Sequence, residues 1–96
     1  MSKVDVSMLY SLIDVRLSPA LRDRTEMKVV GESGLSARID GEKCLTSIGV
    51  WPNGCCDVDF LFVSPEKGGF KHFEFECTEE AATQLLSEIR LAVERA

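Results

Sequence analysis

The sequence predicts an α+β domain: an antiparallel meander of about five strands with an N-terminal and a C-terminal helix packed on one face. Two observations predict the elements: apolar residues recur at helical spacing near both ends, and they alternate with polar residues between residues 27 and 77. A third predicts the topology. The alternating segments are joined by short connections, whereas parallel strands need crossovers of about a dozen residues or more. Two-layer packing of the helices on one sheet face follows.

The bulk composition is that of one folded domain spanning residues 1–96, with 45% hydrophobic residues and a net charge of −5. The negative charge disfavours nucleic-acid binding, which relies on Lys and Arg at the phosphates. We see no secretory signal and no apolar run of the roughly 18 residues that a membrane span needs. We therefore expect a cytoplasmic protein with reduced cysteines and with no membrane or nucleic-acid partner.

The first helix is expected between Val4 and Leu17, where apolar residues recur at helical spacing. Ser18 followed by Pro19 then restarts the helix, since Ser is a good N-cap and Pro a good first residue. A short second helical turn through Arg22 follows from this signal.

From residue 27 the period changes to two. The alternation predicts strands at 27–32, 35–40, 44–51, 55–63 and 70–77. Turns are expected at 32–34, 41–43 and 52–54, and a longer loop that contains Pro and Gly at 64–69. Thr78 is the expected N-cap of the last helix, with Glu79 and Glu80 in its first turn. That helix presents one apolar stripe: Ala82, Leu85, Leu86, Ile89 and Val93.

The turns predict the register of the two central hairpins. A three-residue loop at 52–54 pairs Trp51 with Cys55, and therefore Gly49 with Asp57. In the next hairpin we expect Phe60 to oppose Phe73 on the inner face, because a slip by one residue would expose both rings. This register sets two pairs of carboxylates side by side on the outer face: Asp59 beside Glu74, and Asp57 beside Glu76.

Like charges opposed on a sheet are destabilising, so such a cluster favours a role in binding a cationic partner. The candidate partner-binding residues on the outer face are Asp57, Asp59, Glu74, Glu76, Trp51, His72 and Asp40. An exposed Trp beside charged groups is typical of an interface anchor. The alternative is a solvated polar face, with Trp51 buried at the sheet edge under the first helix.

Metal and catalytic sites are the weaker interpretations. His72 among strand carboxylates, with no second His or Cys placed nearby, is a poor zinc signature, and a flat sheet is a poor site for a hard cation. We therefore expect no metal and no cofactor. Cys55 shares the face of His72, but no residue is evident to orient the imidazole, so we expect no enzyme activity. Cys56 and Cys77 are expected as cross-strand neighbours on the inner face.

Three stretches resemble one family of small bacterial proteins. They are SARID (36–40), SIGVWPNGCCDVDFLFV (47–63) and FKHFEFECTEE (70–80). Together they resemble the immunity proteins of contact-dependent inhibition and related polymorphic toxin systems, in particular the TriTu-type group. The likeness covers somewhat under half of the chain well, and the Ser18-Pro19 break departs from it.

The resemblance implies a protein that is not an enzyme and that neutralises a cognate toxin. Its partner would be a toxin C-terminal domain with a basic surface, in many such systems a nuclease, which the acidic face would bind in place of nucleic acid. We expect a monomer. The competing class is an intracellular adaptor or regulatory module that binds some other protein.

Overall fold

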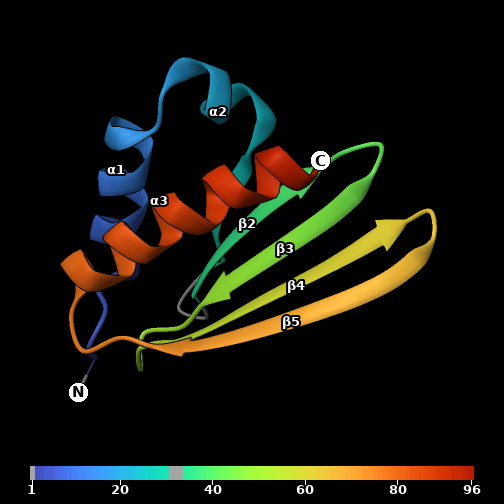
Figure 1. The fold of residues 1–96 in the computed structure, drawn as a ribbon. Helices are drawn as coiled ribbons and strands as arrows, with labels where there is room; N and C mark the ends of the chain where they lie inside the picture. Colours follow the sequence, from blue (N-terminus) through green and yellow to red (C-terminus); the bar gives the residue numbers. More distant parts are fainter. Residues whose placement is uncertain (1, 31–33) are drawn as a thin grey trace.

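The structure, a computed structural model, describes residues 2–30 and 34–96. It confirms the α+β prediction: five antiparallel strands form one sheet in the order β1-β2-β3-β4-β5. All three helices lie on one side of this sheet, as Figure 1 shows. Within the described part of the chain, no helix is long and apolar enough to cross a membrane.

The first N-terminal helix lies within the range predicted from apolar spacing, and the second begins where the Ser18-Pro19 signal predicts it. In α1 (Val6–Arg16) the N-cap Asp5 accepts a hydrogen bond from the backbone N–H of Met8. In α2 (Pro19–Arg24) the N-cap is Ser18, followed by Pro at the first helical position. Side-chain oxygens at both N-caps thus satisfy amide groups that the helices themselves leave free.

The last helix, α3 (Thr78–Arg95), begins after Cys77 rather than after Thr78, so the predicted N-cap was wrong by one residue. The Thr78 hydroxyl instead accepts a hydrogen bond from the backbone N–H of Asp5, at 2.9 Å. It therefore ties the start of α3 to the start of α1. Arg16 and Glu79 join the same two helices through an ion pair of 2.7 Å, and that contact lowers the pKa of the Glu79 carboxyl from its usual value.

The strands are β1 (Glu26–Val30), β2 (Gly34–Asp40), β3 (Cys44–Val50), β4 (Cys55–Val63) and β5 (Glu66–Glu74). The predicted turn at 32–34 and the end of the predicted first strand fall mainly on residues 31–33, outside the described residues. The core lies between the sheet and the helices. It includes Leu9 and Ile13 of α1, Ile39 and Ile48 of the sheet, and Leu85 and Ile89 of α3.

The register of β3 with β4 confirms the turn argument. Gly49 pairs with Asp57, and the backbone N–H of Trp51 donates to the carbonyl of Cys55 at 2.9 Å. The register of β4 with β5 differs from the prediction by four residues. Phe60 lies opposite Gly69, not opposite Phe73.

This difference has a physical cause in Gly68 and Gly69, which lie in the predicted loop at 64–69 but belong to β5. The strands run on through Gly68 and Gly69 almost to the tip of the hairpin, where Val63 pairs with Glu66. Longer strands make more ladder hydrogen bonds, and the ring of Phe60 lies over the bare backbone of Gly69. A glycine inside a strand here marks a close approach of another side chain, not a turn.

The observed register predicts unequal roles for these two glycines. A Cβ atom at Gly69 would lie 2.2 Å from the Phe60 ring, whereas one at Gly68 would meet only the Phe60 carbonyl at 3.7 Å. We expect Gly69→Ala to lower the free energy of unfolding by about 1–3 kcal/mol through overpacking. Gly68→Ala is the matched control and should be neutral or stabilising by up to about 1 kcal/mol. Urea denaturation measures both, and equal effects would contradict the register.

Long side chains connect the β4–β5 hairpin to α3. Lys71 of β5 forms an ion pair of 3.1 Å with Glu88 of α3, whose side chain is almost fully buried. The guanidinium of Arg95 lies 4.3 Å from the centroid of the Phe60 ring, a distance typical of a cation–π contact. Charged side chains therefore connect α3 to the strands β4 and β5. Among residues 2–30 and 34–96, no helix lies on the opposite face of the sheet (Figure 1).

Candidate functional site

The candidate site is the sheet face that points away from the helices, here called the outer face. It carries every second residue of each strand, for example Asp57, Asp59, His72 and Glu74. Trp51 lies at its end: the indole ring covers Gly49 and 40% of the residue is exposed. The alternative placement of Trp51 under the first helix is thus wrong.

The predicted cluster of four mutually opposed carboxylates does not form, because of the four-residue difference in register. Asp57 faces His72, and Asp59 faces Phe70. Glu76 lies beyond the end of β5, where its carboxylate is 3.1 Å from Lys3 Nζ. The like-charge repulsion that the sequence suggested is therefore largely absent.

Two of these acids nevertheless keep an uncompensated charge. Among residues 2–30 and 34–96, Asp59 and Glu74 have no ion-pair or side-chain hydrogen-bond partner. Asp40, at the end of β2, is 3.5 Å from Arg38 Nη2 on the same face, in an exposed pair of the kind that contributes little stability. Of the four acids predicted to cluster, Asp59 and Glu74 are therefore the two whose carboxylates stay unpaired within the described residues.

His72 has an orienting partner that the sequence argument did not identify. Its Nδ1 lies 2.7 Å from Asp57 Oδ1, the residue directly opposite on β4. This contact assigns Nδ1 to Asp57 and leaves Nε2 for other ligands. The expectation that no residue orients His72 is therefore wrong, for the same reason of register.

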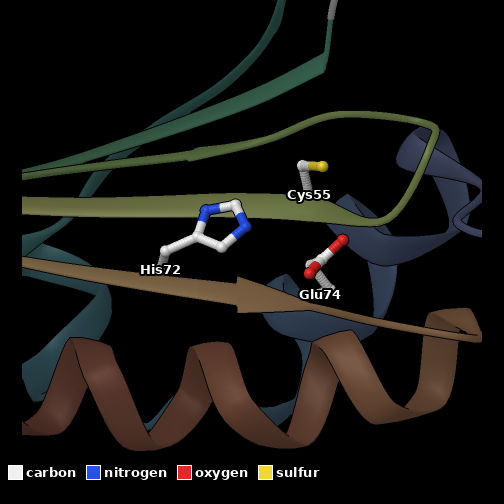
Figure 2. A group of neighbouring side chains, drawn as sticks. All are labelled: Cys55, His72 and Glu74. Carbon is white, nitrogen blue, oxygen red and sulfur yellow. The ribbon is translucent and has the colours of Figure 1, made fainter.

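Cys55 and Glu74 complete a small cluster around that imidazole. Glu74 is the cross-strand partner of Cys55, and His72 precedes it by two residues on the same face. One donor atom from each of the three side chains lies within 4.8 Å of the others. In Figure 2 the Nε2 edge of the His72 ring points toward Cys55 and Glu74.

The other cysteines have different surroundings. Cys56 pairs with Phe73, not with Cys77, which is exposed just before α3, so the predicted Cys56–Cys77 neighbours are wrong. Burial, with smaller contributions from the charges of Asp57 and Glu88, raises the pKa of the Cys56 thiol to about 12. Cys56 is therefore a neutral core residue, and Cys55 is the thiol that the outer face presents.

The outer face also exposes apolar side chains that the sequence analysis did not single out. Phe70 is 62% exposed, and the paired residues Leu45 and Leu61 are each more than a third exposed. The sequence does contain a signal for the exposure of Phe70, because Phe70 alternates with His72 and Glu74 and so lies on the same face.

Two open hollows lie on this face, with volumes of about 350 and 340 Å³. Leu45 and Leu61 line the first, and Trp51 lines the second. Asp59 and Ser47 line both, so the unpaired carboxylate of Asp59 sits between two partly apolar depressions. Such a combination of aromatic anchor, apolar surface and central charge is suited to protein recognition.

No family model, curated protein or solved structure matches this chain. The outer face thus carries two candidate sites: the partly apolar surface around Asp59, and the separate group of Cys55, His72 and Glu74 at the end that carries Trp51.

Proposed function

We propose that this protein is a binding protein of the immunity type, which captures a toxin domain with a basic surface in the cytoplasm through its outer face. The observation that carries the proposal is the uncovered sheet face on which Trp51 and Phe70 are exposed around the unpaired Asp59. The resemblance of residues 36–40, 47–63 and 70–80 to TriTu-type immunity proteins supports the same partner class.

Charge complementarity is the argument for a basic occupant. The chain has a net charge of −5, and a Lys or Arg of the partner placed at Asp59 would neutralise a carboxylate that lacks an ion pair within the described residues. Attraction between opposite charges also steers the two proteins together and raises the association rate. A fast rate is an advantage for a protein that must bind a toxin before the toxin acts. The apolar residues around Asp59 would supply the desolvated centre of the interface.

The test is a binding measurement with the protein encoded directly beside this chain's gene, where the proposal places the cognate toxin. We expect Asp59→Lys to raise the Kd by at least about tenfold, because a charged pair within an interface contributes several kcal/mol when desolvated. The loss should be larger at low ionic strength. Glu94→Lys, which makes the same charge change at an exposed position of α3, is the control and should bind like the unchanged protein.

Two outcomes would contradict the proposal. If Glu94→Lys weakens binding and Asp59→Lys does not, the interface lies on the helix layer. If the neighbouring domain neither binds nor arrests growth when this protein is absent, the adaptor function is favoured over immunity. Glu74 is left unchanged throughout, so that the group of Cys55, His72 and Glu74 stays intact in both variants.

A further inference from the structure

The group of Cys55, His72 and Glu74 has the donors and the placement of a metal site. Their side chains supply a sulfur, an imidazole nitrogen and a carboxylate oxygen, with one donor of each within 4.8 Å of the others. In a tetrahedral zinc site neighbouring donor atoms are about 3–4 Å apart, as the usual bond lengths require. Cys55 is only partly buried, and His72 and Glu74 are exposed. Small side-chain rotations therefore bring the three donor atoms from within 4.8 Å to the spacing of a zinc site.

A second feature points in the same direction. Histidines that bind metals almost always donate their other ring N–H to a carboxylate or carbonyl, which holds the ring and the tautomer. His72 has this arrangement: Nδ1 is 2.7 Å from Asp57 Oδ1, and the Nε2 edge points toward Cys55 and Glu74 (Figure 2). All four residues lie on paired strands, which hold them more rigidly than a loop.

We propose that Cys55, His72 and Glu74 bind one divalent transition-metal ion of the zinc type, with Asp57 orienting His72. Thiolate and imidazole ligands suit zinc, whereas calcium and magnesium prefer six or more oxygens. The three side chains leave a fourth position for water or a partner's side chain. The ion would also neutralise Glu74, which has no ion pair within the described residues.

A competing interpretation is a nucleophilic Cys55 with His72 as base and Asp57 as orienting group. The position of Glu74 argues against it. A neighbouring carboxylate disfavours a thiolate nucleophile, but it adds a ligand to a metal site. The proposal needs no partner protein, so it stands or fails separately from the toxin-binding function.

The experiment is a titration of the untagged, reduced protein with Co²⁺ and then with competing Zn²⁺. We expect one equivalent of Co²⁺ to produce the thiolate-to-metal charge-transfer band, and Zn²⁺ to abolish it and raise the Tm. Cys55→Ser should remove the band, and His72→Gln and Glu74→Gln should each weaken binding by about tenfold or more. Asp57→Asn should weaken it by about 10–100-fold. Circular dichroism confirms that each variant is folded.

Cys77→Ser is the matched control, because Cys77 is exposed but lies outside the cluster. It should bind Co²⁺ like the unchanged protein. A spectrum without a thiolate band, equal effects of Cys55→Ser and Cys77→Ser, or full binding by the ligand variants would overturn the proposal. So would faster alkylation of Cys55 than of Cys77 by iodoacetamide in a protein that binds no Co²⁺, which would identify a nucleophile instead.

Discussion

Gly54→Ala is expected to lower the free energy of unfolding by about 3 kcal/mol. Gly54 has a φ of +95°, and a Cβ atom there would lie 2.2 Å from the carbonyl oxygen of Phe75. The backbone conformation alone costs an L-residue about 1–2 kcal/mol, and the overlap adds about 1–3 kcal/mol. The clash is with backbone and not with a side chain that could rotate away.

The same glycine closes the end of the sheet that carries Cys55, His72 and Glu74. Its N–H donates to the Trp51 carbonyl at 3.0 Å, and its own carbonyl accepts from the Phe75 N–H at 2.8 Å. Equilibrium urea denaturation measures the effect, with Gly68→Ala as the control, because a Cβ atom there would make only an ordinary contact with the Phe60 carbonyl at 3.7 Å. A loss below about 1 kcal/mol would show that the turn tolerates a side chain.

Lys71→Met is expected to cost about 3 kcal/mol, because it leaves the carboxylate of Glu88 buried without its cation. Lys71 Nζ lies 3.1 Å from Glu88 Oε1, and the side chain of Glu88 is only 3% exposed. Breaking a buried ion pair costs about 3–5 kcal/mol, and the lower end applies here because Lys71 is partly exposed. Gln84 still donates to Glu88 at 3.2 Å, which limits the loss.

A double-mutant cycle separates the interaction energy of the Lys71–Glu88 ion pair from the effect of each side chain on the surrounding packing. Lys71→Met combined with Glu88→Leu should recover most of the stability, to within about 1 kcal/mol of the unchanged protein, since no charge is then left buried. Lys3→Met, which breaks the exposed Lys3–Glu76 pair, is the control and should change stability by less than about 0.5 kcal/mol. A double variant as unstable as Lys71→Met would contradict this account.

The sequence predicted most of the fold because its local signals agree with one another. Ser18-Pro19 marked the start of α2, and the bounds of β4 were predicted to the residue. The three-residue turn at 52–54 gave the register of β3 with β4, because a short loop leaves few ways to pair its flanking strands. The missed N-cap of α3 shows the limit of such signals, since Thr78 is engaged by Asp5 from the other end of the chain.

The register of β4 with β5 could not be predicted in the same way. A shift of four residues leaves every side chain on the same face, so the alternation of apolar and polar residues fits both registers equally well. The difference depends on Phe60 packing over Gly69 and on the longer ladder. Both are properties of the paired strands and not of either strand alone.

By itself, the sequence determined which side chains point outward: period-two alternation placed Asp57, Asp59, His72 and Glu74 together on the face away from the helices. Only the tertiary structure decided which of them meet, because cross-strand neighbours depend on register. It set His72 against Asp57 and Glu74 against Cys55, and left Asp59 facing Phe70. The predicted cluster of like charges is thereby divided into a candidate docking surface around Asp59 and a separate candidate metal site.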